Sequence, residues 1–205
     1  MSYPLDERLA PLAPLRTFLQ LFASAQGLFW LAWWAGYAWL PEGVLRGRML
    51  PAALPLERLD TAGRVVAVLG WNVLAAAVFV AGANRLRVRR LPLGFVPPLV
   101  YWGLYGQLLG TNSFVPPLPE RPAPSLATIL ARSGFMELTA YVLVAAATAG
   151  WSRWCQESWL GGPVRRLDPR PLRAPEYTML AVAGVLLAAA ALREVSQWCG
   201  ASGGC

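Results

Sequence analysis

The sequence from Ser125 to Gly150, SLATILARSGFMELTAYVLVAAATAG, places two ionisable residues at the head of an apolar helix rich in small side chains. These residues are Arg132 and Glu137. Placing an ionisable side chain inside a membrane-spanning segment costs free energy, so our first hypothesis is that such a residue belongs to a functional site. We expect the other apolar segments of the chain to hold this helix in place.

The composition is that of a membrane protein. Of the 205 residues, 56% are hydrophobic and only 14% are charged, whereas soluble domains carry roughly a quarter charged residues. The ten Trp and six Tyr agree, because both residue types favour the membrane–water interface. There is no His, so the commonest proton shuttle and metal ligand is missing.

The pattern of apolar segments predicts an all-α, polytopic helix bundle that forms a single transmembrane domain over residues 1–205. About 20 apolar residues of helix cover a hydrocarbon core of about 30 Å. Five segments satisfy or approach this length and are predicted as spans, at residues 17–40, 65–84, 95–115, 134–152 and 176–197. The first is too long for a signal-peptide core, so we expect it to remain as a helix.

The segment before the fourth span needs separate treatment. Ser125 to Arg132 is too short to cross a bilayer, and Ser133-Gly134 can interrupt or redirect the helix. Two arrangements fit: one long kinked helix, or a short interfacial or re-entrant helix before the fourth span, which we favour. Arg132 could pair with Glu137 only if the chain bends at Ser133-Gly134. Otherwise Glu137 is expected to bond backbone N–H groups or another Arg.

Other polar or small residues in the apolar segments are further candidates. Asn72 and Gln107 could line a polar path or bond a neighbouring helix, and Asn112 marks the outer end of the third span. A stripe of three glycines allows close helix packing, as in small-xxx-small contacts, or lines a cavity. The stripe consists of Gly103, Gly106 and Gly110.

The arginine distribution predicts an orientation. With the N-terminus inside, eleven of the 18 arginines lie on the cytoplasmic side, as the positive-inside rule requires: Arg8, Arg16, Arg85, Arg87, Arg89, Arg90, Arg153, Arg165, Arg166, Arg170 and Arg173. The cluster of Arg85, Arg87, Arg89 and Arg90 is a candidate for contact with anionic lipid or a partner. Five spans then put the C-terminus outside, where Cys199 and Cys205 could form a disulfide.

The sequence offers little for catalysis. It contains no Walker A loop, no dinucleotide-binding glycine motif, no HExxH and no GxSxG. A paired-carboxylate mechanism would lack its second member, because Glu137 is the only carboxylate placed inside the membrane, and Glu194 is expected at the outer interface. We therefore predict a non-enzymatic protein without a cofactor or metal. The basic charge is explained by the orientation rather than by nucleic-acid binding.

The run Ser133-Gly134-Phe135-Met136-Glu137-Leu138-Thr139-Ala140, followed by a small-residue helix to Gly150, resembles the signature of the stage II sporulation protein M family. Asn72 and the glycine helix that ends in Asn112 extend the resemblance over about residues 65–152. It implies a multi-pass protein of the bacterial inner membrane. The family's namesake works in a septal or engulfment complex with peptidoglycan-degrading partners. The family usually has His where this chain has Ser133, which favours a structural role for Glu137.

Two functions follow as expectations. The first is a membrane scaffold or accessory subunit, whose partners are the lipid bilayer and other membrane subunits or further copies of itself. The second is a small transporter or channel subunit in which Glu137, Gln107, Asn72 and Arg132 line a path. The two differ in whether Glu137 supports assembly or moves ions.

Overall fold

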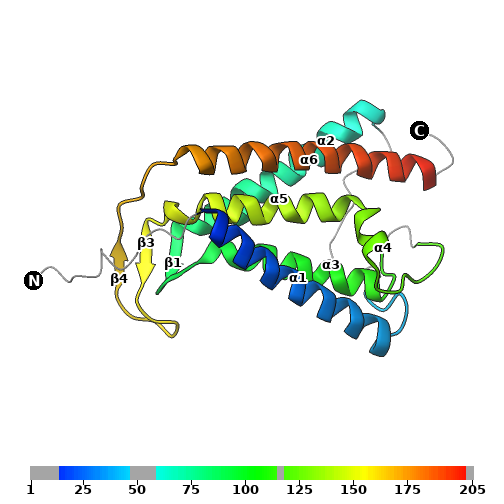
Figure 1. Cartoon of the computed structure of the whole chain (residues 1–205), viewed down its shortest axis with the longest axis horizontal. Coiled ribbons are helices and arrows are strands. Elements are labelled where there is room, and N and C mark those ends of the chain that lie inside the picture. The colour runs from blue at the N-terminus through cyan, green and yellow to red at the C-terminus, as the bar shows by residue number, and fades with distance from the viewer. Residues whose placement is uncertain (1–13, 47–58, 115–117, 202–205) are drawn as a thin grey trace, which may run out of the picture.

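The computed structural model describes residues 14–46, 59–114 and 118–201, and 69% of these described residues are helical. Five long helical segments lie side by side along the long axis, and successive segments run in opposite directions (Figure 1). They are α1 (Pro14–Trp39), α2 (Thr61–Ala75) with its continuations η2 (Ala76–Gly82) and η3 (Ala83–Arg85), α3 (Val96–Gly110), α5 (Ser133–Ala147) and α6 (Ala174–Ala201). Each overlaps one of the five expected segments.

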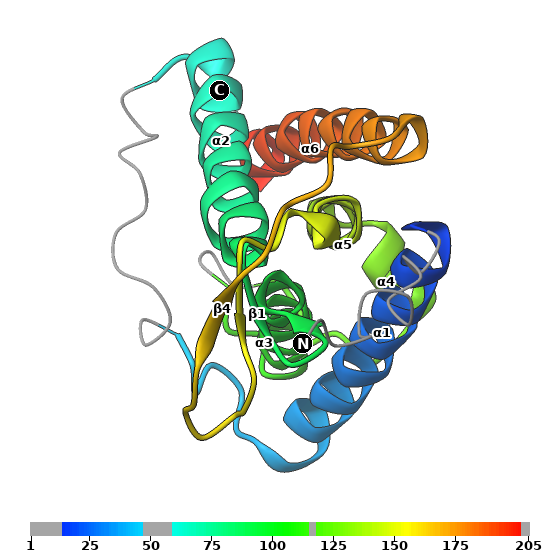
Figure 2. The same cartoon turned by 90° about the vertical axis from the view of Figure 1, so that its left-hand side faces the viewer.

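Helix α5, the second half of the stretch quoted first, is the central helix. It contacts α1, α3, α6 and η2, and Figure 2 shows it between α6 and α3 when the molecule is seen end-on. From Ala140 to Ala147 every one of its residues is buried. Small side chains at these positions let several helices approach α5 at once. The rest of the fold is therefore packed around this helix.

Helices α1 and α3 run in the same direction and form the closest helix pair. The buried residues of α1 recur every three or four positions, from Thr17 through Phe29 and Trp33 to Gly36, which is one helical stripe. A Cβ atom at Gly110 would lie 2.5 Å from the Trp33 carbonyl oxygen, and one at Gly106 would overlap the Phe29 carbonyl oxygen. Gly106 and Gly110 therefore lie directly against the backbone of α1, whereas Gly103 faces the Leu28 side chain.

The expectation of an all-α chain is incomplete, because four short strands form a sheet at one end of the bundle. The strands are β1 (Leu86–Val88), β2 (Leu91–Pro92), β3 (Trp154–Gln156) and β4 (Val164–Arg166), in the order β2-β1-β3-β4. β1 and β3 pair in parallel, with Arg87 opposite Cys155, while the other pairs are antiparallel. The sheet joins the segment between α2 and α3 to the segment between α5 and α6.

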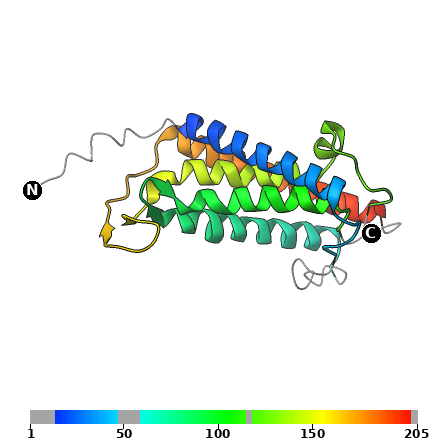
Figure 3. The same ribbon diagram turned by 90° about the horizontal axis from the view of Figure 1, so that it is seen from below.

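The sheet lies at one end of the bundle only, so the two ends of the bundle differ (Figure 3). We call the end with the four strands and the start of α1 the sheet end. We call the opposite end, with residues 40–46, 59–60, 111–114 and 118–132 and the end of α6, the loop end. The short turns η4 (Leu93–Phe95) and η5 (Ala149–Trp151) lie at the sheet end, and α4 (Leu126–Leu130) lies at the loop end.

Two helices are long and apolar enough to cross a membrane, Thr61–Arg85 and Ala174–Gly200. In each, only 28% of the most apolar 18-residue window is buried within the chain. A core helix of a soluble protein would be mostly buried, so these helices hint at a membrane location. Helix α5 is a shorter apolar helix of 15 residues. Crossing of the membrane by all five segments remains a prediction.

Candidate functional site

The chain bends before α5, as the favoured arrangement requires. Ser125 caps the five-residue helix α4 by accepting a hydrogen bond from the Thr128 N–H at 3.2 Å. Arg132 is then extended, with φ −115° and ψ 151°, and α5 begins at Ser133. A short helix thus precedes the fourth long helix, and Glu137 lies in the second turn of α5.

Glu137 is bonded by a tyrosine. The Tyr141 hydroxyl, one turn later on α5, donates a hydrogen bond of 2.8 Å to Glu137 Oε1. Among the described residues, the expected partners of Glu137, which are backbone N–H groups or an arginine, do not bond it. Although the chain bends next to the point where pairing with Arg132 requires a bend, the Arg132 guanidinium lies over the Phe114 ring, 5.8 Å from its centroid. The chain bends at Arg132 itself, one residue before Ser133-Gly134, and this bend directs the Arg132 side chain away from Glu137.

The ring of Tyr105 brings the ionisable groups of three helices together. A Cβ atom at Gly134 would lie 2.7 Å from this ring, so the glycine gives Tyr105 its place against α5. The Tyr105 hydroxyl is buried without a hydrogen-bond partner within the described ranges. It interacts electrostatically with Arg132, with Glu137 of α5 and with Arg193 and Glu194 of α6. Glu194, which was expected at the outer interface, is thus a second carboxylate close enough to interact with Glu137.

The other two predicted polar residues, Asn72 and Gln107, form no hydrogen bond with Glu137. Asn72 is buried on α2, and its amide nitrogen has no partner in the part of the chain that the structure describes. The side-chain oxygen Oε1 of Gln107 is also buried and has no hydrogen-bond partner among the described residues, and a Cβ at Gly36 of α1 would lie 3.1 Å from it. Gln107 therefore lies at the α1–α3 contact rather than on a polar path with Glu137.

Asn112 ends α3 and organises the loop end. Its φ of 46° is left-handed, a conformation that Asn tolerates. The Ser113 N–H bonds the Leu108 carbonyl at 3.0 Å and the Asn112 N–H bonds that of Leu109 at 3.2 Å, which is a Schellman motif. The Asn112 amide also donates to Glu42 Oε1 at 2.6 Å and exchanges two hydrogen bonds with the backbone of Leu118.

Arg121 caps two helices at once. Its guanidinium donates to the carbonyl oxygens of Gly36 and Gly110 at 2.7 Å each, and to that of Leu40 at 2.9 Å. It also lies 4.9 Å from the centre of the Tyr37 ring. Because α1 and α3 run in the same direction, both present the carbonyl oxygens of their last turn and the negative end of their dipoles here. One cation therefore neutralises both helix ends.

At the sheet end the hub is Asn84. It is fully buried and donates hydrogen bonds to the Ala145 carbonyl at 2.8 Å and to Thr148 Oγ1 at 2.7 Å. The Ser152 hydroxyl donates to the Asn84 carbonyl at 2.9 Å. A Cβ atom at Gly94 would overlap Asn84 Oδ1 and the Val80 carbonyl oxygen, so only glycine fits there. Asn84 thus ties the end of the second helical segment to the end of α5.

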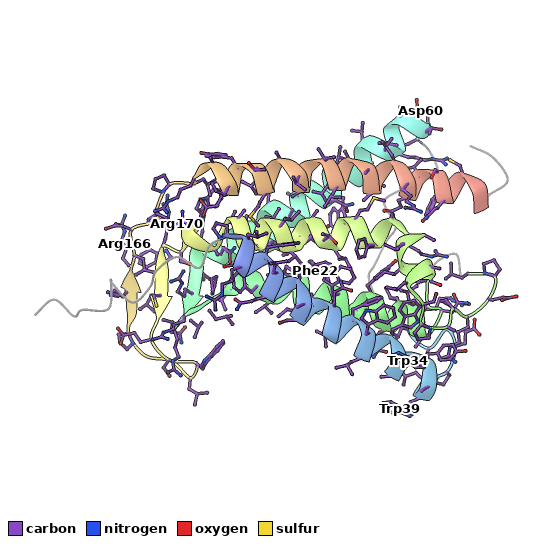
Figure 4. The ribbon with its side chains drawn as sticks, in the orientation of Figure 1. Phe22, Trp34, Trp39, Asp60, Arg166 and Arg170 are labelled. Carbon is purple, nitrogen blue, oxygen red and sulfur yellow. The ribbon has the colours of Figure 1, made fainter. Side chains whose placement is uncertain are left out.

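The predicted basic cluster lies on and around β1. Arg85, Arg89 and Arg90 are exposed, whereas Arg87 is half-buried and donates to the Ala149 carbonyl at 3.2 Å. Burial lowers the pKa of the Arg87 guanidinium, an effect that the nearby Cys155 opposes. Two more arginines, Arg165 and Arg166, lie on the strand β4, where the sequence alone indicates only a loop. Figure 4 shows two of the arginines of this end, Arg166 and Arg170.

Several residues that shape these sites were not predicted. Tyr141 could have been found from its spacing, because positions i and i+4 share a helix face with Glu137. Arg121 and Asn84 give no signal in the sequence, since their roles depend on segments that meet only in the fold. The predicted pair of Cys199 and Cys205 stays a prediction, because Cys205 lies outside the described residues.

Within the described ranges, no group of three or more His, Cys, Asp or Glu side chains could hold a metal ion. No family model, curated protein or solved structure matches the chain. The resemblance to the stage II sporulation protein M family therefore remains an expectation.

Proposed function

We propose that the chain is a multi-pass protein of the bacterial inner membrane that serves as a non-enzymatic scaffold or accessory subunit of a membrane complex. In this proposal all five long segments cross the bilayer. The sheet end faces the cytoplasm and the C-terminus lies outside, as the positive-inside rule favours. The observation that carries the proposal is the exposed apolar surface of the helices between two polar ends.

Large apolar side chains face outward on each of the peripheral helices. On the second segment Val66, Trp71 and Phe79 are at least half exposed, and on α6 Val185 is 67% exposed. Near the end of α1, Trp34 and Trp39 point away from the bundle (Figure 4). Contiguous apolar surface of this kind needs lipid or another subunit to cover it.

The polar residues support a structural role. Asn84, Asn112 and Arg121 spend their hydrogen bonds on helix ends and loops of the same chain. The bond between Tyr141 and Glu137 likewise stays within α5. Groups committed in this way stabilise the bundle and leave its outer faces for assembly.

The test is isolation of the tagged full-length chain from native membranes in a mild detergent, followed by native mass spectrometry. Retention in the membrane after alkaline carbonate washing and a partner in fixed stoichiometry are the expected results. Release by carbonate would contradict the membrane location. A chain that remains in the membrane but is isolated without any other protein would contradict the accessory-subunit role.

A small transporter or channel subunit is the second candidate, favoured by the second carboxylate near Glu137 and the unbonded Tyr105 hydroxyl. Glu137→Gln separates the two functions. In a scaffold, loss of the carboxylate charge should lower assembly or stability, although Gln retains an oxygen that can accept the Tyr141 hydrogen bond. A transporter should lose proton- or cation-coupled flux in liposomes with the same variant.

A further inference from the structure

The loop between β3 and β4 presents apolar side chains with nothing covering them. Leu160 is 99% exposed and Trp159 is 58% exposed. The loop is nevertheless well defined: the Glu157 N–H bonds the Pro163 carbonyl at 3.4 Å across its base, and the Leu160 N–H bonds Ser158 Oγ at 3.3 Å. Gly161 and Gly162 have φ values of 109° and 125°, which turn the chain back sharply after Leu160.

The position of this loop relative to the helices is informative. In Figure 1 the strands β1, β3 and β4 follow one another outward from the bundle, so β4 is the strand farthest from the helices. The loop that joins β3 to β4 does not continue outward. In Figures 1 and 3 it bends back toward the helix ends, beside the bundle. If the five segments span a bilayer, this is the level of the lipid headgroups.

The charge around the loop indicates what lies there. The sheet end carries ten arginines and only three carboxylates among its described residues, and one of those carboxylates, Glu176, is paired with Arg170. Arg89 and Arg90, in the turn between β1 and β2, are exposed. Indole and leucine side chains next to arginines form the combination that settles at an anionic membrane surface.

We infer that the β3–β4 loop is an interfacial anchor, in which Trp159 and Leu160 insert into the headgroup layer of an anionic leaflet beside the arginines of the sheet end. The inference rests on the proposed membrane location. It adds a lipid contact outside the helices, which would fix the height and tilt of the sheet end at the cytoplasmic surface. Insertion of the loop would also cover the most exposed apolar side chains of this end.

The test is photo-crosslinking of the full-length protein in nanodiscs of phosphatidylcholine and phosphatidylglycerol. Three single variants carry p-benzoylphenylalanine, at Leu160, at Val164 on β4 and at Val185 in the middle of α6. All three positions are at least 60% exposed, so the probe disturbs no packing, which an unchanged unfolding midpoint verifies. Lipid adducts are identified by mass spectrometry after illumination.

We expect lipid adducts at positions 160 and 185, with a yield at 160 severalfold above that at 164. Adducts at 185 together with equal, low yields at 160 and 164 would overturn the anchor and leave the membrane location intact. Absence of adducts at 185 would instead contradict the membrane location itself. In native membranes, crosslinking of position 160 to a protein in place of lipid would overturn the anchor in favour of a docking site.

The lipid class gives the second readout. The ratio of phosphatidylglycerol to phosphatidylcholine adducts should be severalfold higher at position 160 than at position 185. Arg89→Gln with Arg90→Gln should lower that ratio at 160 and leave it unchanged at 185. Equal ratios at the two positions in the unaltered background would overturn the anionic preference.

Discussion

The two ends of the bundle use the same residue type in opposite ways. At the sheet end, eight of the ten described arginines are exposed, and only Arg87 and Arg170 are half-buried. At the loop end, the described residues include four arginines and four carboxylates, and three of these arginines are partly buried. Arg121 there spends its guanidinium on three carbonyl oxygens of two helices. An arginine at the loop end is thus part of the interior, whereas at the sheet end it is part of the surface.

This difference teaches how a helical bundle can be closed at one end and left open for contact at the other. The C-terminal ends of α1 and α3 are capped by the side chain of Arg121 from the loop end, so this arginine has a structural role within the chain. Apart from Arg170, the arginines around the sheet form no ion pair within the described residues, so their charge is left to the surroundings. The predictions below break or sharpen this contrast in order of decreasing effect on stability.

The largest effect is expected for Arg121→Ala at the loop end. Three carbonyl oxygens lose a charged donor, and we expect destabilisation by about 3 kcal/mol, since hydrogen bonds to charged groups contribute about 1.5–3 kcal/mol each and this side chain is partly exposed. For a chain of this length that corresponds to a fall of about 6–12 °C in the unfolding midpoint. Thermal unfolding in detergent, followed by circular dichroism, measures it. Arg121→Lys should lose about half as much, because an ammonium cannot reach two helix ends at once. An unchanged midpoint for Arg121→Ala would remove the proposed cap.

Gly94→Ala tests the interior of the sheet end. The added methyl group meets Asn84 and the Val80 backbone, and overpacking of this kind costs about 1–3 kcal/mol. Gly70→Ala is the matched control, because a Cβ at Gly70 on α2 meets nothing within 4 Å and alanine favours helix by up to about 1 kcal/mol. The two variants should move the unfolding midpoint in opposite directions. A shift of the same sign and size in both would show that the contact with Asn84 is unimportant.

Tyr141→Phe tests the bond within α5. Loss of the hydroxyl leaves Glu137 without its donor, and we expect a cost of about 1 kcal/mol. Glu137→Gln retains an acceptor and should cost less. The double variant then gives the coupling between the two side chains. Equal effects of Tyr141→Phe in the wild-type and Glu137→Gln backgrounds, measured by thermal unfolding, would mean that the carboxylate charge adds nothing to the bond.

The smallest effect on stability is expected for Arg165→Gln combined with Arg166→Gln. Both side chains are exposed on the outermost strand, so the free energy of unfolding should change by less than about 0.5 kcal/mol. The same thermal measurement as for Arg121 gives a direct comparison of the two ends. A loss comparable to that of Arg121→Ala would erase the distinction between interior and surface arginines.

The sequence predicts the long helices well because each is a continuous apolar run, and the Pro124-Ser125 pair also marks the start of a short helix. The sheet escapes such reasoning. Its strands have two or three residues, too few for an alternating pattern, and β1 pairs with β3 across more than 60 residues of sequence. Neighbouring arginines at 165 and 166 favour a loop on composition alone.

The candidate site divides along the same line. Glu137 is visible because it interrupts an apolar run, and its partner Tyr141 follows at helical spacing. Glu194 and Tyr105 come to it from other helices, so only the packing of α3, α5 and α6 reveals them. Arg132 is near Glu137 in sequence and is therefore a candidate partner for it. The bend before α5 instead places the Arg132 guanidinium over the Phe114 ring.

The parallel contact between α1 and α3 has a consequence for biosynthesis. The surface that α1 presents to α3 is built from Phe29, Trp33 and Gly36, and its counterpart, Gly106 to Gly110, is made about 70 residues later. The whole second helical segment must therefore be synthesised before α3, the helix that packs most closely against α1. The cap from Arg121 comes later still. During synthesis the aromatic face of α1 stays uncovered until α3 has been made. A nascent chain that stops before residue 96 lacks α3, so this face remains exposed.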